Sequence, residues 1–381
     1  METLRILWFN WRCIKHPLAG GAEVYTHEIA KRLVKMGHEI IWVTARPKEL
    51  PSEEIIEGYK VIRRGNKYTV YLKAKEVYHE LTKQGWKPDM VIDEVNTLPF
   101  FTPLYVKESI VMLIHQLCKE CWRYAVHPLA EKPGWLLEKT CHKLYVKAVR
   151  DGKIKVVITV SESTRWDLLH LGYPRNKIRI VYNGLEWALY RNYNKLSSKE
   201  PLAIYIGRIT PYKRLEDLIR SWSIVEQKLS SEVKLVIAGR PKIDYLNKLK
   251  LLTRKIQLEN IEFKVNISQE EKRSLLAKAS VLIYTSTREG WGQIILEAAA
   301  CKTPTIAYDV PGLRDSVKHM RTGILVRPGN IEKLAQTITC LLTDYGLRSK
   351  LAENAYRYAQ QYSWDKTAKE FLKVIKGVVH G

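Results

Sequence analysis

Short apolar runs rich in valine and isoleucine alternate with helix-like segments along nearly the whole chain. The runs span residues 4–10, 39–44, 90–95, 109–114, 154–160 and 178–182 in the first half, and 202–206, 233–238, 261–265, 281–284, 303–307 and 324–326 in the second. Continuous apolar runs of this length are typical of strands that are buried on both faces of a sheet. Because helical segments separate them, the pattern predicts an α/β fold with parallel sheets.

Turn and capping residues indicate where the helices lie. Helices are predicted over residues 21–36, 163–171, 268–277, 332–342, 347–361 and 363–378. Gly37 and Gly172 end the first two, since glycine readily adopts the left-handed conformation that closes a helix. Ser268 and Glu271 stand three positions apart and form a capping box, which predicts that a helix begins there.

The length of the chain and one change in composition predict two domains. With 381 residues, the chain exceeds the size of one typical hydrophobic core. Residues 186–201 interrupt the strand–helix alternation with asparagines, serines and a proline, which is typical of an interdomain linker. Two doubly wound sheets in tandem would place a ligand in the cleft between them, at the carboxyl ends of the strands.

The net charge of the chain limits the classes of partner that it is expected to bind. It carries 63 lysines and arginines against 40 acidic residues, a formal net charge of +23, which attracts polyanions. No helix-turn-helix, RRM or zinc-finger signature is present, so a nucleic-acid partner is not expected. No run approaches the roughly 18 apolar residues of a membrane span, and the first strand begins too early for a signal peptide. We expect a cytoplasmic protein with peripheral contact to the inner face of an anionic membrane.

The segment from His115 to Arg150 is the one best suited to a membrane surface, because aromatic and basic residues are interleaved in it. Between Trp135 and Ala148 the apolar positions on one helical face are 136, 137, 141, 144, 145 and 148. A basic amphipathic helix with aromatic anchors indicates membrane-surface binding. The alternative is that this face packs on its own domain.

Six cysteines in a chain of this length do not form a disulfide framework. Cys118 and Cys121 form a C-x-x-C pair. Other ligand-type residues near that pair in sequence are His115, His127, Cys141 and His142. A zinc site and a disulfide both stay open, but the second C-x-x-C or spaced histidine pair that zinc sites use is missing. Unreactive thiols are therefore the favoured interpretation.

Glu289 and Glu297 stand eight positions apart across a Gly-x-Gly loop that leads into a helix. The amides at a helix start, together with the positive end of its dipole, are suited to binding phosphate. Carboxylates accept hydrogen bonds from sugar hydroxyls. The segment therefore favours a nucleotide-sugar site. The alternative is one surface glutamate and one ordinary first-turn acid.

Three further segments at strand ends offer matching chemistry. Gly20 and Gly21 precede the first helix, where glycine lets a ligand approach the backbone and its amides. Arg208 and Lys213 follow the first strand of the second half and are suited to neutralising a diphosphate leaving group, although solvated surface bases are the alternative. His115 follows strand 109–114 at the same predicted cleft. A single histidine at such a position is more often structural, but beside these other segments we expect it to belong to the site. The sequence contains no Asp-x-Asp, so no metal clamp for a diphosphate is expected.

An ordered set of motifs extends along nearly the full chain. The motifs are Gly20-Gly21-Ala22-Glu23, His115-Gln116, Thr159-Val160-Ser161-Glu162-Ser163, Tyr182-Asn183-Gly184, Gly207-Arg208 with Lys213, Glu289 with Glu297, and Tyr362-Ser363-Trp364. Together they resemble the retaining glycosyltransferases of the GT-B fold, specifically glycosyltransferase family 4. One departure is Trp291, where the family often has phenylalanine, which puts sugar preference in doubt but not the role of Glu289.

The resemblance implies a role for each matching residue of the second domain. Glu297 would hold the ribose hydroxyls, and Arg208 and Lys213 the diphosphate. Glu289 would contact hydroxyls of the transferred sugar. The backbone that would cradle phosphate is that of Gly292, Gln293, Ile294 and Ile295. In this scheme the glutamates bind the donor, and the two cations stabilise the charge that develops as the sugar–phosphate bond ionises.

The resemblance also implies roles for the first domain. Gly21 would approach the donor phosphate or the acceptor, and His115 would contact the sugar near the reacting carbon. The chain would cross back at Ser363-Trp364, so that its last helix packs on the first domain. The expected division is therefore residues 1–190 with the returning helix 363–381, and residues 191–362 as the donor domain.

The function expected from these features is transfer of a hexose, with retention, from a UDP- or GDP-sugar to a lipid-linked or other membrane-proximal glycan acceptor. No cofactor and no metal are expected, since the nucleotide sugar is a substrate. One alternative keeps the fold and changes the acceptor, as in a soluble glucan or disaccharide-type synthase. An alternative from a different class is a polyanion-binding protein without catalysis.

Overall fold

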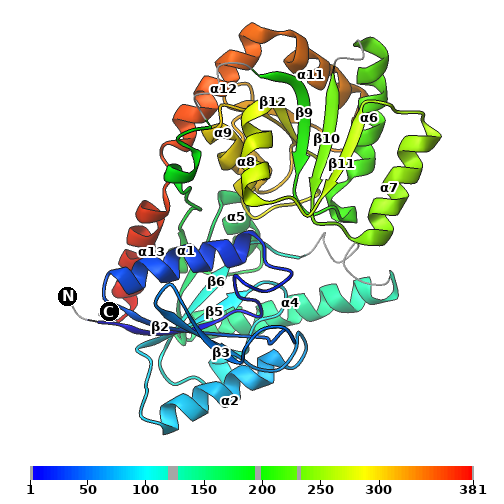
Figure 1. The fold of residues 1–381 in the computed structure, drawn as a ribbon. Helices are drawn as coiled ribbons and strands as arrows, with labels where there is room; N and C mark the ends of the chain where they lie inside the picture. Colours follow the sequence, from blue (N-terminus) through cyan, green and yellow to red (C-terminus); the bar gives the residue numbers. More distant parts are fainter. Residues whose placement is uncertain (1–2, 119–127, 194–198, 230–232, 380–381) are drawn as a thin grey trace. The chain divides into compact units, whose positions relative to one another are not determined.

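The chain folds into two compact units. The computed structural model describes residues 3–118, 128–193, 199–229 and 233–379, and of residues 128–133 the backbone alone. Unit 1 consists of Met1–Gly184 and Trp364–Gly381, and unit 2 of Leu185–Ser363 (Figure 1). Each unit has one largely or wholly parallel sheet with helices on its faces. The predicted α/β class with two parallel-sheet domains is confirmed.

Unit 1 is built on an eight-stranded sheet. Its strands are β1 (Arg5–Phe9), β2 (Glu39–Thr44), β3 (Glu53–Ile56), β4 (Tyr59–Arg63), β5 (Met90–Val95), β6 (Ser109–Ile114), β7 (Ile154–Thr159) and β8 (Ile178–Ile180). Its helices include α1 (Gly21–Lys35), α2 (Val70–Lys83), α4 (Pro128–Arg150), α5 (Glu162–His170) and α13 (Trp364–Val379). The strand order is β3-β4-β2-β1-β5-β6-β7-β8. Buried side chains of α2 and α4 pack with those of the strands in two apolar clusters.

The β3–β4 hairpin at one edge of this sheet was not predicted. It is the antiparallel pair of the sheet, with Glu53 opposite Ile62 and Ile56 opposite Tyr59. The edge strand β3 contains two glutamates in four residues and is mostly exposed. Charged residues on a short edge strand prevent edge-to-edge association, and they also hide the strand from a search for apolar runs.

The last helix of the chain belongs to unit 1, as predicted. α13 lies beside α1 in Figure 1, and the two helices are in contact. The ring of Phe371 stacks on that of Trp8 in β1, with centroids 5.3 Å apart, and both side chains are fully buried. Thr367 donates a hydrogen bond of 3.0 Å to the carbonyl of Tyr182. The carboxyl-terminal segment therefore completes the core of the amino-terminal unit.

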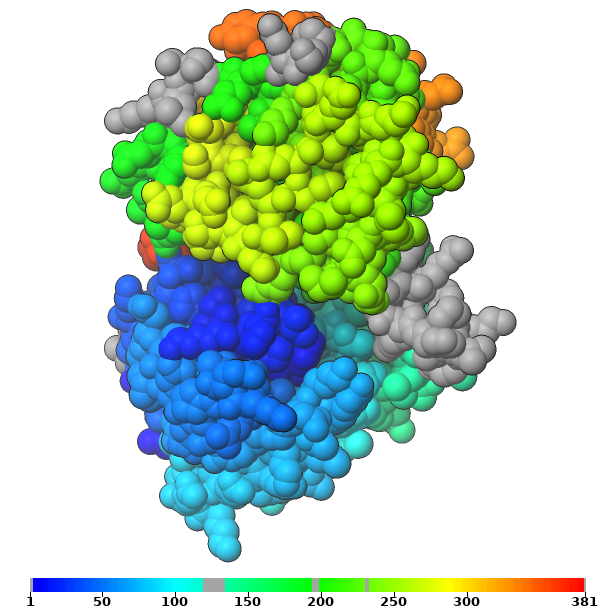
Figure 2. Space-filling view, turned by 45° about the vertical axis from the view of Figure 1, so that its right-hand side comes forward, coloured from blue at the N-terminus to red at the C-terminus, as the bar shows by residue number. Residues whose placement is uncertain are grey.

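Unit 2 is built on a six-stranded sheet, in which every neighbouring pair is parallel. Its strands are β9 (Glu200–Ile206), β10 (Lys234–Gly239), β11 (Ile261–Val265), β12 (Ala279–Tyr284), β13 (Thr305–Tyr308) and β14 (Gly323–Val326). Its helices include α6 (Leu215–Lys228), α7 (Ile243–Lys255), α8 (Gln269–Lys278), α9 (Gln293–Ala300), α10 (Leu313–Ser316), α11 (Ile331–Thr343) and α12 (Tyr345–Ala359). The predicted capping box of Ser268 and Glu271 opens α8. Figure 2 shows α7 and α8 forming much of one face of this unit.

The strand order defines where each unit can bind a ligand. In unit 2 the order is β11-β10-β9-β12-β13-β14, so the chain winds outward in opposite directions from β9 and β12. The same reversal occurs between β1 and β5 in unit 1. At such a switch point, the loops that follow the two central strands diverge and leave a crevice at the carboxyl ends. The predicted site residues Arg208 and Lys213 follow β9, and Glu289 follows β12.

The amphipathic helix predicted over 135–148 is part of the longer helix α4. Cys141, Tyr145 and Ala148 are buried against the sheet, as expected if the helix packs on its own domain. Leu136 and Leu137, assigned to the same apolar face, are exposed, because the amino-terminal end of α4 extends beyond the sheet (Figure 1). The single apolar face was therefore wrong for the first turns of the helix. No helix among the described residues is long and apolar enough to cross a membrane.

Replacing Phe371 with alanine should destabilise unit 1 by about 3–5 kcal/mol, the usual range for emptying a buried aromatic site. The stacked partner Trp8 would lose its contact and a cavity would remain. Chemical denaturation followed by tryptophan fluorescence measures the change. Lys369→Ala, an exposed position on the same helix, is the control and should stay within about 0.5 kcal/mol. Equal stability of the two variants would contradict the role of α13.

Candidate active site

Lys213 is a buried cation at the carboxyl end of β9. It ends the 3-10 turn η4 (Pro211–Lys213), and only 4% of its side chain is exposed. Its Nζ donates a hydrogen bond of 3.0 Å to the hydroxyl of Tyr284 and forms an ion pair with Glu289. The Nζ also lies 4.8 Å from the ring centroid of Tyr212 and 4.7 Å from that of Tyr284, within the range of cation–π attraction. The sheet thus brings two predicted site residues, Lys213 and Glu289, into direct contact.

Two opposing effects set the pKa of Lys213. Burial disfavours the ammonium form, whereas the Glu289 carboxylate and the neighbouring tyrosines favour it. The attraction outweighs the burial, and the pKa of Lys213 lies well above its usual value. Lys213 is therefore a permanent positive charge across the physiological pH range.

Arg208 lies close to Lys213. Its guanidinium carbon is 5.6 Å from the centroid of the Tyr212 ring, the ring that Lys213 also faces. The hydroxyl of Tyr205 donates to the Arg208 carbonyl at 2.8 Å, and the Tyr205 ring stacks on Tyr284 with centroids 5.3 Å apart. The two predicted cations are thus held by three tyrosines that sequence analysis did not single out.

The loop that carries Glu289 is fixed by its backbone. The amide of Glu289 donates to the carbonyl of Pro311 at 3.1 Å. Gly312 has a φ of +83°, and a Cβ at that position would lie 2.0 Å from the Glu289 carbonyl oxygen. Only glycine combines this conformation with this contact. The position of Glu289 therefore depends on a glycine that has no chemical role of its own.

The helix after this loop offers an anion site. The N-cap of α9 is Gly292, which has a φ of +87° and no side chain that could cap the first turn. The amide of Ile295 donates to the Gly292 carbonyl at 2.9 Å. The first residues of α9 are Gln293, Ile294 and Ile295, whose backbone was predicted to cradle phosphate. The amides at a helix start and the positive end of the helix dipole attract anions.

Glu297 lies farther along α9 and has a different cation. Lys272 of α8 places its Nζ 2.7 Å from Glu297 Oε2, and the two side chains are 18% and 12% exposed. Glu289 and Glu297 are therefore each held by one lysine, Lys213 and Lys272. Sequence analysis missed Lys272, because only the tertiary packing of α8 on α9 brings it to the glutamate.

Trp291, the departure from the usual family motif, is not on the surface. Its side chain is 3% exposed, and its ring centroid lies 5.4 Å from that of Tyr362. The larger ring is therefore accommodated inside unit 2. Any influence of this tryptophan on sugar preference would act through the packing of the loop.

In unit 1, His115 is oriented by a buried carboxylate. Glu94 in β5 is fully buried and accepts hydrogen bonds from Trp8 Nε1 at 2.7 Å and from Thr26 Oγ1 at 2.5 Å. Nε2 of His115 lies 3.0 Å from the other oxygen of Glu94. The ring of Tyr25 meets that of His115 edge-on, with centroids 5.1 Å apart. In this arrangement Glu94 accepts from the ring, so His115 Nε2 is the nitrogen that donates.

This arrangement leaves one nitrogen of His115 for a ligand. The second ring nitrogen, Nδ1, makes no hydrogen bond to any part of the chain that the structure describes. The His115 ring is held on one side by Glu94 and on another by Tyr25. Sequence analysis identified His115 but missed Glu94, which stands next to Asp93 in an otherwise apolar strand. That buried position was the available signal, because an unpaired carboxylate inside a strand is costly.

Gly21 begins α1, next to open space. A Cβ at Gly21 would meet nothing within 4 Å. Glu23 is fully buried and accepts hydrogen bonds from the Gly20 amide at 2.6 Å and from Arg12 Nε at 2.8 Å. The glutamate of this motif therefore holds the turn, and the open side of Gly21 lets a ligand approach the helix start.

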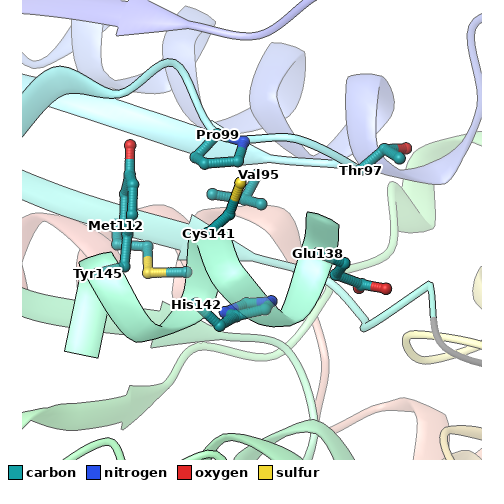
Figure 3. Close-up of a pocket in the computed structure, with 8 residues that line it drawn as sticks. All are labelled: Val95, Thr97, Pro99, Met112, Glu138, Cys141, His142 and Tyr145. Atoms are coloured by element: carbon teal, nitrogen blue, oxygen red, sulfur yellow. The ribbon is translucent and has the colours of Figure 1, made fainter. Parts of the chain in front are cut away.

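The cysteine-rich segment does not form a metal centre in the part that the structure describes. No group of three or more histidine, cysteine or acidic residues there is arranged to hold a metal ion. Figure 3 shows the thiol of Cys141, the imidazole of His142 and the carboxylate of Glu138 pointing in different directions around a cavity of about 10 Å³, room for one water at most. Burial lowers the pKa of His142 to about 4, so its ring is neutral. Cys121 and His127, the other members of the motif, lie outside the described residues.

The two halves of the chain match two family models. The model for group 1 glycosyl transferases matches residues 188–358, and the model for glycosyltransferase family 4 matches residues 19–187. An uncharacterized glycosyltransferase of Methanocaldococcus jannaschii is 28% identical over 387 residues, covering 94% of this chain and 95% of the relative. D-inositol 3-phosphate glycosyltransferase of Thermomonospora curvata is 25% identical over 393 residues, covering 94% of this chain and 91% of the relative.

A solved structure shows the same fold. The Anabaena protein HepE, in complex with UDP and glucose, has a TM-score of 0.74 and 18% identity, covering 98% of this chain and 100% of that one. Two parallel-sheet units, each with polar groups at its switch point, define the GT-B class. The chain belongs to the group 1 glycosyltransferases of GT-B type, with an amino-terminal half of the family 4 type.

Glu94→Gln should lower kcat by about tenfold to a hundredfold, because a hydrogen bond to a charged group contributes about 1.5–3 kcal/mol. The donor KM should change little, since Glu94 acts through His115. Initial rates of sugar transfer measure both quantities. Glu80→Gln, an exposed glutamate on α2, is the matched control. A Glu94→Gln variant that melts like the wild type and keeps its kcat would show that Glu94 is not a positioning residue.

Proposed function

We propose that this protein is a retaining hexosyltransferase that uses a UDP- or GDP-sugar as donor and a lipid-linked or membrane-proximal glycan as acceptor. The observation that carries the donor part is the cluster of Arg208, Lys213 and Glu289, which the chain places just before the start of α9. It combines cations and amides for a diphosphate with a carboxylate for sugar hydroxyls. The complex of HepE with UDP and glucose supports a nucleotide-sugar donor.

The donor contacts divide along the loop and helix that carry them. We assign the diphosphate to Arg208, Lys213 and the first amides of α9, and the ribose hydroxyls to Glu297. One carboxylate oxygen of Glu289 pairs with Lys213, and the other can accept a hydrogen bond from a hydroxyl of the transferred sugar. Lys213 then has two tasks, since it fixes Glu289 and adds positive charge near the leaving group. We assign His115, held by Glu94, to contact with the sugar near its reacting carbon. The open side of Gly21 is assigned to the donor phosphate or the acceptor.

The reaction proposed for this site is driven by electrostatics. The bond between the sugar and the phosphate ionises, and the departing negative charge is stabilised by the two cations and the helix dipole. The acceptor hydroxyl attacks the face that the phosphate has just left and gives its proton to that phosphate, which retains the configuration at the sugar carbon. This scheme needs neither a carboxylate nucleophile nor a metal ion.

The amino-terminal end of α4 supports a membrane-proximal acceptor. Trp135, Leu136 and Leu137 are 40%, 59% and 47% exposed. Three lysines follow on the exposed side of the same helix, namely Lys139, Lys143 and Lys147. The Nζ of Lys139 lies 5.1 Å from the centroid of the Trp135 ring. Exposed apolar side chains next to lysines are typical of helices that bind the surface of an anionic membrane.

A second candidate keeps the chemistry and changes the acceptor to a soluble phosphorylated polyol or sugar. The relative from Thermomonospora curvata, named for D-inositol 3-phosphate, favours it. This candidate needs no membrane contact, so it leaves the exposed residues of α4 without a role.

Lys213→Ala should weaken binding of the donor and reduce transfer by a factor that corresponds to about 2–4 kcal/mol in the transition state. The variant loses a cation and leaves Glu289 unpaired beside the diphosphate. A thermal-shift screen with UDP-, GDP- and ADP-sugars, followed by transfer assays, measures both effects, because a ligand that binds the native state raises its melting temperature.

Two further variants sharpen this test. Lys255→Ala removes an exposed lysine of α7 and should leave the donor response unchanged. Glu289→Gln should reduce transfer while the protein still responds to free nucleoside diphosphate. If both Lys213→Ala and Glu289→Gln transfer sugar at the wild-type rate, the assignment of the site is wrong.

Leu136→Ser combined with Leu137→Ser should reduce binding to vesicles that contain anionic phospholipid by about tenfold or more. Full burial of one leucine contributes about 1.5–3 kcal/mol, of which an interfacial position recovers a part. Vesicle sedimentation at low salt measures the partitioning. Leu251→Ser, at a leucine of α7 that is 63% exposed, is the control. Unchanged vesicle binding, together with full transfer to free inositol phosphate, would contradict a membrane-proximal acceptor and favour the soluble phosphorylated one.

A further inference from the structure

A groove of about 600 Å³ runs along α13 in unit 1. It lies where the sheet extends past this helix to its edge strand β8. Side chains of β7, of the turn before β8, of β8 itself and of α13 line it. This volume falls within the range of small-molecule sites, and none of the assigned catalytic residues contributes to it.

The groove combines an apolar floor with a cationic rim. Buried Val156 and Val181, with the partly buried Ile180, Val374 and Val378, form the floor. The charged residues that line it are Lys155, Lys177, Arg179, Lys373 and Glu370. Four cations thus face one acid.

These cations are not neutralised by the protein. Within the described part of the chain, none of Lys155, Lys177, Arg179 and Lys373 forms an ion pair, whereas many other surface lysines and arginines do, Lys73 with Glu76 being one example. Lys155, Arg179 and Lys373 are exposed, and Lys177 is half-buried. Like charges gathered over apolar surface repel one another, and an anion that sits among them removes that repulsion.

The Lys155 end of the groove lies away from the candidate catalytic histidine of unit 1. Lys155 stands near the amino end of β7, whereas His115 follows the carboxyl end of the neighbouring strand β6. Parallel neighbours present these two ends at opposite edges of one sheet. A phosphate held near Lys155 is therefore at the opposite sheet edge from His115. The other end of the groove reaches Val181, whose carbonyl accepts a hydrogen bond of 3.1 Å from Tyr25, the residue whose ring meets His115.

The edge of the sheet disfavours an added peptide strand. Arg179 Nη1 donates to the carbonyls of Asn176 at 2.7 Å and Ile178 at 3.0 Å. A peptide that extended the sheet beyond β8 would need backbone acceptors along this edge, and it would have to displace the arginine. The remaining nitrogens of Arg179, Nε and Nη2, have no partner among the described residues and suit the oxygens of a phosphate.

We propose that this groove binds one anionic phospholipid, with its phosphate among Lys155, Arg179 and Lys373 and the start of its acyl chains on the valine floor. An amphiphile with one anionic end matches both halves of the groove, whereas an inorganic anion uses the rim alone. The site is independent of the proposed sugar transfer and would hold a lipid whether or not that lipid is an acceptor.

The test uses the full chain and a lipid that is soluble as a monomer. Dihexanoyl phosphatidylglycerol, below its micelle concentration, should bind with one-to-one stoichiometry in calorimetry, and dihexanoyl phosphatidylcholine should bind at least tenfold more weakly. Lys155→Ala combined with Lys373→Ala should lower the affinity by roughly fivefold for each lysine removed. Val374→Ser should also lower the affinity for the lipid, because it removes apolar surface from the floor of the groove.

Two controls separate the groove from other effects. Lys250→Ala, an exposed lysine of α7, should bind the lipid like the wild type. The groove variants should keep their thermal shift with a nucleotide sugar, which shows that they are folded and that the donor site is intact.

Three results would overturn the proposal. The first is no binding of dihexanoyl phosphatidylglycerol to the wild type, or binding that the groove variants do not change. The second is inorganic phosphate binding as tightly as the lipid, since the floor would then have no role. The third is an RNA oligonucleotide or an acidic peptide that occupies the groove and displaces the lipid at lower concentration.

Discussion

Parallel strands can be joined only by crossovers, and this constraint places each candidate catalytic group of the protein. A crossover returns the chain to the amino end of the next strand, so the loops at the carboxyl ends are the ones free to vary and to carry polar residues. Arg208 and Lys213 follow β9, Glu289 follows β12, and His115 follows β6. Each of these strands is buried on both sides, and the rigid sheets fix the points from which the side chains extend.

Charge inside the protein is a second common element of the two candidate sites. Glu94 is fully buried with three donors around it, and Lys213 is buried against Glu289 and two tyrosines. Buried charges contribute little to stability, since removal from water costs about as much as the pairing returns. Their consequence is geometric: an ionised group that is paired on one side can reorient only by losing that partner. His115 and Glu289 are therefore presented to a ligand in one orientation each.

Sequence periodicity predicted most of the fold, because strands buried on both faces must be apolar throughout. It missed the β3–β4 hairpin, whose edge strand carries two glutamates. It also misplaced Leu136 and Leu137, because the point where a helix passes the rim of a sheet depends on tertiary packing. For the site, glycines and charges at strand ends pointed to Lys213 and Glu289. The residues that hold the site come from other strands and helices, and no local pattern links them: Tyr284 bonds Lys213, Lys272 pairs with Glu297, and Glu94 contacts His115. Sequence thus indicated which residues have chemistry, and only the fold shows which of them hold the others in place.

The path of the chain has a consequence for its synthesis. Unit 2 is one continuous segment, whereas unit 1 is interrupted after Gly184 and resumes at Trp364. During translation the ribosome releases all of unit 2 before it releases α13, and domains generally fold as units from the amino terminus. Until then Trp8, in the first strand to be made, lacks the ring of Phe371 on which it stacks. The amino-terminal unit must therefore wait, with an uncovered aromatic surface, until α13 has been made, and that interval is when a nascent chain would need protection from aggregation.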